Sequence, residues 1–167
     1  LLDLQRMELI REVSRVPEPG YLFNHPLTHE ATYNTILLKQ RRQMHRRVAE
    51  VIESLRGDDS PSATAPVLAH HFLEGDAPER ALPYLQMAAA DALRLHATVE
   101  AIAFYDRALP IARDTAAGAP HLAAIAAARG RALELQSRFH EADAAYAEME
   151  QLSLERNDPA LELEMVL

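Results

Sequence analysis

The second half of the chain repeats one spacing of small and large side chains, and this spacing constrains its fold more than any other feature. A small residue is followed twelve positions later by a second small residue, and four positions after that by a large one. The three sets are Ala69, Ala81 and Leu85; Ala89, Ala101 and Tyr105; and Gly130, Ala142 and Tyr146. Small residues let two helices approach closely, and a larger side chain fills the groove between them. The spacing therefore predicts a succession of packed helical hairpins.

Turn-forming residues separate the helices that this spacing predicts. The breaks fall at Gly75-Asp76, Thr98, Gly118-Ala119-Pro120 and Asn157-Asp158-Pro159. They delimit expected helices at about 64–74, 78–96, 98–114, 120–137, 139–155 and 158–167. The sets do not recur at a constant interval along the sequence, because Ala69 and Ala89 are 20 residues apart whereas Ala89 and Gly130 are 41 apart. We therefore expect the helix at 78–96 to serve two successive hairpins.

This pattern resembles degenerate tetratricopeptide (TPR) repeats. The resemblance implies a right-handed array of helical hairpins over residues 67–167. Each hairpin of such an array buries its apolar face against its neighbours. The resemblance is informative about architecture, and much less so about function.

Residues 1–24 have the pattern of a helix followed by two short strands. We expect a helix to about Met7, a strand over 9–14, a turn at Pro17, Pro19 and Gly20, and a strand over 21–24. The residue before a proline is driven out of the α region, so His25, which precedes Pro26, should be extended. Thr28 is the expected N-cap of the next helix. The chain as a whole is predicted to be mainly α, with a partial winged helix before the array.

One motif lies across the junction between the second strand and the next helix. Its pattern is Phe23-x-His25-x-Leu27-x-x-Glu30-x-x-Tyr33. It resembles the end of the winged helix in STAND regulators, the multidomain signal-transduction ATPases that include proteins fused to nucleotide cyclases. In that family the histidine reaches toward the β-phosphate of ADP held by a neighbouring ATPase domain. The resemblance implies that His25 senses nucleotide in a longer parent protein, which would bind ATP or ADP, with no cofactor in this chain.

The residue types alone leave the role of His25 open. A partly buried structural histidine is the alternative, and Phe23, Leu27 and Tyr33 are expected to pack in a core. A charge-assisted bond from an imidazole to a phosphate contributes about 1.5–3 kcal/mol. Such a contribution is enough to shift a two-state equilibrium about tenfold or more.

Two histidine pairs suggest metal binding, and the sequence supports neither. His25 and His29 are expected on different elements, and a third ligand of suitable spacing is missing. His70 and His71 are adjacent, so on a helix they point about 100° apart. No metal site is predicted.

Residues 39–55 predict an amphipathic helix that ends before Gly57. Its apolar face contains Met44, Val48, Val51, Ile52 and Leu55, and its basic face contains Lys39, Arg42 and Arg46. The basic face is a candidate surface for a phosphate or an acidic partner. The alternative is a solvated face whose arginine stems cover apolar surface. Arg42 and His45 also recur in the STAND cyclase-type pattern.

Residues 57–66 are rich in turn formers, and we interpret them as a linker. The predicted organisation is therefore 1–56 for the winged-helix segment and connecting helix, 57–66 for the linker, and 67–167 for the repeats. Both ends of the chain are expected to be cuts within a longer protein.

Composition excludes several classes of function. The chain has no cysteine, which excludes disulfides and thiolate metal sites and is compatible with the cytoplasm. It has no apolar run near the roughly 20 residues that span a bilayer, so no membrane association is expected. Residues 1–57 carry nine basic and seven acidic side chains, whereas the remainder carries eight and eighteen. An acidic array is a poor surface for nucleic acid. No phosphate-binding loop or nucleophile motif is present, so we predict no catalytic residue and no enzyme activity in this chain.

Three functions stay open from the sequence. The first is a non-catalytic regulatory and protein-interaction part of a multidomain nucleotide-dependent signalling protein, which couples an upstream ATPase domain to the TPR arm. The second is a free-standing TPR scaffold that binds a protein or peptide. The third is a DNA-binding winged helix, which residues 1–8 support poorly because they offer Arg6 against Asp3 and Glu8. Partners are thus a protein or the ATPase domain, and a homo-oligomer is a further possibility.

Overall fold

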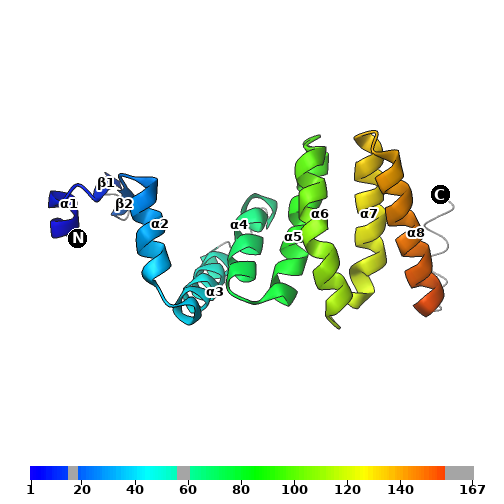
Figure 1. Cartoon of the computed structure of the whole chain (residues 1–167), viewed down its shortest axis with the longest axis horizontal. Coiled ribbons are helices and arrows are strands. Elements are labelled where there is room, and N and C mark those ends of the chain that lie inside the picture. Colours follow the sequence, from blue (N-terminus) through cyan, green and yellow to red (C-terminus); the bar gives the residue numbers. More distant parts are fainter. Residues whose placement is uncertain (15–18, 56–60, 157–167) are drawn as a thin grey trace. The chain divides into compact units, whose positions relative to one another are not determined.

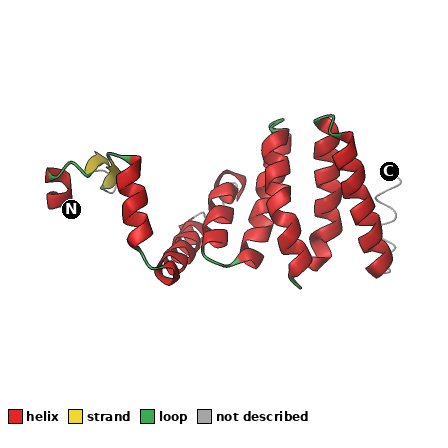
Figure 2. Cartoon of the chain, in the orientation of Figure 1, coloured by secondary structure: helices red, strands yellow, loops and turns green. Residues whose placement is uncertain are grey.

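The computed structural model describes residues 1–14, 19–55 and 61–156 (Figure 1). The chain divides into two compact units, residues 1–41 and residues 42–167. Helices dominate the described residues, and the strands among them form one two-stranded sheet (Figure 2). The predicted mainly α class is therefore confirmed.

The division between the units differs from the predicted domain boundary. It falls between Arg41 and Arg42, inside helix α3 (Leu38–Leu55), and not in the expected linker at 57–66. Residues 61–66 of that linker already belong to helix α4 (Pro61–Glu74). The two prolines of the segment do not end the helix: Pro61 opens its first turn, where a proline is well tolerated, and Pro66 lies inside it. Residues 57–60 lie outside the described residues.

The first unit contains a short helix, a β-hairpin and a second helix. Helix α1 (Leu2–Arg6) precedes strand β1 (Ile10–Ser14), which pairs antiparallel with strand β2 (Gly20–Phe23). Ile10 lies opposite Phe23, and the register shifts between Glu12 and Ser14. The predicted order of helix, strand and strand is confirmed. The predicted turn prolines fall partly outside the described residues.

Helix α2 (Pro26–Thr35) begins earlier than predicted. His25 is its N-cap, with φ −129° and ψ 132°, so the expectation of an extended His25 is confirmed and that of a Thr28 cap is wrong. The physical reason is Pro26, because proline has no N–H to lose at the first helical position and its fixed φ suits the helix. The same proline keeps His25 extended.

The second unit is a row of helices, and from α4 onward the described helices are joined by short turns. After α3 and α4 come α5 (Pro78–Arg94), α6 (Thr98–Asp114), the short 3-10 turn η1 (Ala119–His121), α7 (Leu122–Leu135) and α8 (Phe139–Arg156). From α4 to α8, each helix packs mainly on the next one along the chain, and they lie side by side (Figure 1). The predicted helix limits agree with these within three residues. The expected helix at 158–167 lies outside the described residues.

Three of the turns between helices share one backbone geometry. Asp76, His96 and Ser137 have φ values of 57°, 59° and 58°, in the left-handed region. In each case the next amide donates to a carbonyl five residues earlier, a form of helix ending that satisfies otherwise unpaired carbonyls. These bonds are Ala77 to Phe72 at 2.9 Å, Ala97 to Ala92 at 2.8 Å and Arg138 to Leu133 at 2.9 Å. The turn between α6 and α7 is different, since Thr115 Oγ1 there accepts a bond from the Gly118 amide.

The small residues of the predicted spacing lie where helices meet. Ala69, Ala81, Ala89 and Ala101 are fully buried. A Cβ atom added to Gly130 would lie 2.4 Å from the Tyr146 ring, so this position tolerates no side chain without movement. Side chains that complete the core are Leu68, Phe72, Leu85, Leu122, Ile125, Leu133 and Met149. The packing role that the spacing predicts is therefore confirmed. None of the described helices combines the length and the apolar character needed to cross a membrane.

Candidate functional site

The predicted nucleotide-sensing histidine lies at the start of α2. The side chain of His25 is exposed and makes no capping hydrogen bond, while its carbonyl accepts the amides of Thr28 and His29 at 3.1 and 3.2 Å. The alternative of a partly buried structural histidine does not fit this exposure. The position leaves the imidazole accessible, next to the positive end of the α2 dipole.

Aromatic and basic side chains stack along one side of α2. Phe23 meets His29 edge-on with ring centroids 5.2 Å apart, and His29 stacks on Tyr33 at 6.1 Å. The guanidinium of Arg41 lies 4.8 Å from the centre of the Tyr33 ring. The expectation that the motif residues form a core is wrong for Leu27, which is 78% exposed, and for Phe23, which is 38% exposed. His29 and Tyr33 are four residues apart on a helix, a spacing that could have indicated the stack.

The basic face of α3 is divided between an internal contact and solvent. Arg42 forms an ion pair with Asp76 at 3.0 Å. Arg46 donates from Nε to the Gly75 carbonyl and from its terminal nitrogen to the Asp76 carbonyl at 2.7 Å. Lys39 is exposed. From the sequence, these three residues are a candidate partner surface, with a solvated face as the alternative. In the structure Arg42 and Arg46 contact the turn between α4 and α5.

A second polar contact joins α3 to α5. Arg80 reaches two carboxylates of α3, Glu50 at 3.1 Å and Glu53 at 2.6 Å, and the Tyr84 hydroxyl donates to Glu53. The Arg80 guanidinium also lies 4.3 Å from the centre of the buried Phe72 ring. The acidic end of α3 is thereby fixed to the core of the array.

Three imidazoles also converge between side chains of α3 and α4. His45 comes from α3, and His70 and His71 come from α4. His45 Nδ1 lies 2.9 Å from His71 Nδ1, and the nearest ring nitrogens of all three lie within 4.8 Å of one another. Burial, then the neighbouring His45 and His70, lowers the pKa of His71 below its ordinary value, while Glu74 opposes this. Sequence reasoning missed the cluster because it treated His70 and His71 as an isolated pair.

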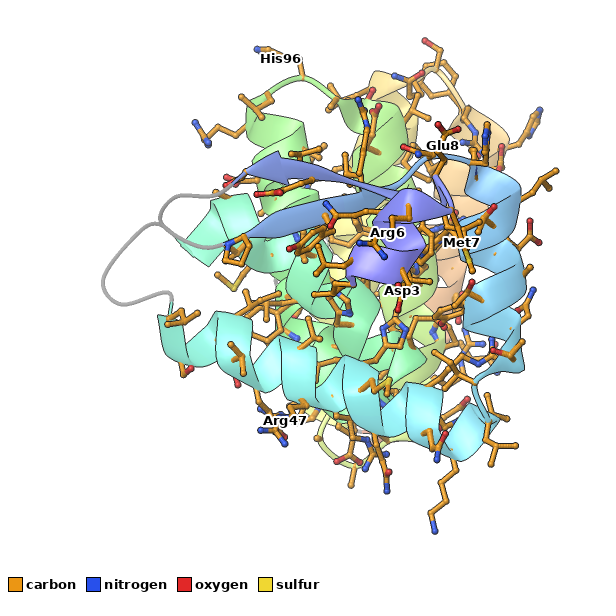
Figure 3. All side chains as sticks on the ribbon, turned by 90° about the vertical axis from the view of Figure 1, so that its left-hand side faces the viewer. Asp3, Arg6, Met7, Glu8, Arg47 and His96 are labelled. Atoms are coloured by element: carbon orange, nitrogen blue, oxygen red, sulfur yellow. The ribbon has the colours of Figure 1, made fainter. Side chains whose placement is uncertain are left out.

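An open apolar depression lies on α3. It is lined by Met44, Val48, Val51 and Ile52, four of the five residues predicted to share the apolar face, together with Arg47. Met44, Val48 and Val51 are 41–55% exposed. The Arg47 side chain points outward from the helix (Figure 3). The described residues thus leave much of this face uncovered.

Comparison with known proteins gives one relative. No family model matches the chain, and no solved structure matches it. An uncharacterised protein of Rhizobium meliloti (strain 1021) is 32% identical over 102 residues, which are 59% of this chain and 10% of that protein. The matched part therefore spans about a tenth of the length of the relative.

Proposed function

We propose that the chain is a regulatory and protein-interaction part of a longer signalling protein, in which a TPR-like array forms an interaction arm. The observation that carries this proposal is the repeated burial of small residues in paired helices. Ala69 and Ala81 are fully buried, and Gly130 lies directly against the Tyr146 ring of the next helix. Stacks built from such hairpins expose long surfaces and commonly bind other proteins. A match to about a tenth of a long protein is in keeping with a part of a multidomain chain.

The unit before the array supports coupling to a nucleotide-binding domain. Its order of helix, hairpin and helix is that expected at the closing half of a winged helix. His25 is exposed at the start of α2, so its N–H is available to an external phosphate. In this proposal an upstream ATPase domain holds ATP or ADP, and His25 reports which one is bound.

Retention of ADP by the full gene product tests this coupling. His25→Ala should weaken ADP binding about tenfold in a calorimetric titration, since it removes one charge-assisted hydrogen bond. His140→Ala is the matched control, because His140 is also exposed but lies on α8. Equal ADP affinity in the wild type and in His25→Ala would remove His25 from this role.

A free-standing scaffold for an apolar peptide is the second candidate. The observation that favours it is the open depression formed by Met44, Val48 and Val51. Peptides from a display library that are selected for binding to this chain should then raise its melting temperature. Val48→Glu should abolish the effect, whereas Gln43→Glu, which adds the same charge to an exposed position of α3, should not. Equal effects of the two variants would exclude this face as the peptide site.

A further inference from the structure

We propose that His45, His70 and His71 form a binding site for a divalent transition-metal ion of the zinc class, which joins α3 to α4. The site does not depend on the proposed signalling role, because it lies within the second unit. No metal role for these residues follows from their sequence positions alone.

The geometry is close to what three imidazole ligands require. Zinc binds imidazole nitrogen at about 2.0–2.1 Å, so two ligands of a tetrahedral site lie roughly 3.4 Å apart. His45 Nδ1 and His71 Nδ1 are already 2.9 Å apart, and no pair in the cluster exceeds 4.8 Å. His70 is exposed, so rotation about its side-chain bonds can supply the remaining movement of about 1.4 Å.

The ring centroids show that the three side chains are gathered in one place. The centroids of His45 and His71 are 5.0 Å apart, those of His45 and His70 5.8 Å, and those of His70 and His71 5.3 Å. Adjacent residues on one helix diverge, but a ligand on a facing helix can lie between them. His45 on α3 occupies that place.

A hydrogen bond is the competing explanation for part of the cluster. One protonated Nδ1 of the pair His45 and His71 can donate to the other, which would explain their 2.9 Å separation without a metal. This explanation gives no role to His70. The two explanations therefore make opposite predictions for substitution of that residue.

The charges around the cluster are compatible with a cation. Glu74 lies four residues after His70 on α4 and supplies a negative charge nearby. The neighbouring Arg42 and Arg46 are engaged with Asp76 and Gly75 at the next turn.

The ligand set indicates the kind of metal. Imidazole nitrogen suits zinc, copper, nickel and iron, whereas magnesium and calcium prefer oxygen. Three imidazoles leave a fourth position of a tetrahedral ion to water. Zinc is thus the probe for affinity, and cobalt(II) is the probe for coordination geometry.

Titration of the untagged chain, residues 1–167, with zinc chloride after treatment with a chelator tests the proposal. We expect one saturable equivalent, visible d–d absorption with cobalt(II), and a zinc-dependent rise in melting temperature. His45→Gln, His70→Gln and His71→Gln should each weaken zinc binding at least about tenfold, since even outer-sphere partners of a metal have effects of that size. His140→Gln is the matched control and should bind as the wild type does.

The exposed His70 makes the outcome decisive. His70→Gln should leave the melting temperature of the metal-free chain unchanged and reduce its zinc-dependent rise at the same zinc concentration. Equal zinc affinity of His70→Gln and the wild type would overturn the proposal and leave a hydrogen-bonded pair. Absence of saturable binding, or equal loss with His140→Gln, would also overturn it.

Discussion

The two units of the chain treat their apolar side chains differently. In residues 42–156 a continuous set of Ala, Leu, Ile and aromatic side chains is buried from α4 to α8, whereas in residues 1–41 the described buried hydrophobic residue is Ile10. Large apolar residues of that first unit stay exposed, among them Leu1, Leu2, Leu4, Met7, Val13, Leu22 and Leu27. A two-stranded hairpin with two short helices offers little surface on which to bury them. Burial of apolar side chains therefore stabilises the array. It contributes far less to the stability of the first unit.

Truncation of one phenylalanine in each unit gives the largest expected effect. Phe72 is fully buried between α4 and α5, so Phe72→Ala should lower the free energy of unfolding by about 3–5 kcal/mol. Phe23 is 38% exposed, so Phe23→Ala should cost much less. Urea denaturation followed by circular dichroism measures both. Similar losses would mean that the units form one cooperative core.

Gly130 provides the next largest effect, and its sign depends on Tyr146. Gly130→Ala places a Cβ against the Tyr146 ring, and overpacking of this kind costs about 1–3 kcal/mol. With Tyr146→Leu in the background, the same change should become neutral or stabilising, because alanine is the better helix former. Gly20→Ala is the matched change in the first unit, where the nearest atom is Val13 Cγ2 at 3.4 Å. Thermal melts of the four variants measure the direction of each change in stability. If Gly130→Ala is equally destabilising in the Tyr146→Leu background, the ring contact is excluded as the cause.

Relief of backbone strain should stabilise the array but not the first unit. His96 adopts a left-handed conformation, with its side chain extending away from the ribbon (Figure 3). His96→Gly should raise the stability of the array by up to about 1 kcal/mol, because the left-handed region costs other residues about 1–2 kcal/mol and glycine loses some entropy. Glu8→Gly relieves the same strain after α1 and should leave the array transition unchanged. Leu95→Gly, at an ordinary φ of −90°, should bring no gain.

Ion pairs give the smallest effect. Arg42→Ala removes the pair with Asp76, whose partners are 45% and 56% exposed, so the loss should not exceed about 1 kcal/mol. Arg6→Ala on α1 removes a more exposed contact with Asp3 at 3.9 Å and should have no measurable effect (Figure 3). Denaturation at low and at high salt measures both. A larger loss for Arg6→Ala would contradict the view that the first unit contributes little.

The helices were predictable because their signals are local. Turn residues such as Gly75 and Gly118 fix the ends of helices, and the small residues mark where helices cross. At the start of α2, Thr28 is a hydroxyl cap candidate while Pro26 suits the first helical position, and the helix begins at Pro26, so the expected cap is wrong. Errors of this kind arise where two local signals compete.

The sites were less predictable because they depend on packing between distant residues. The histidine cluster joins His45 to His71, 26 residues apart, and the sequence holds no signal for how α3 lies on α4. Leu27 fits a core pattern, yet in the described residues no surface covers it. An apolar sequence pattern indicates that a side chain is suited to burial. Whether it is buried depends on whether the fold brings another surface against it.

The recurring turn has a consequence for how the chain can change length. His96 and Ser137 end their helices with the same backbone geometry, and 41 residues separate them. The segment 97–137 is therefore a repeat unit that is bounded at both ends by the same type of turn. A copy inserted after Ser137 would continue the array by one hairpin, and its removal would shorten the array without a new kind of connection. Gene duplication within such a chain can thus adjust the length of the array in steps of one hairpin.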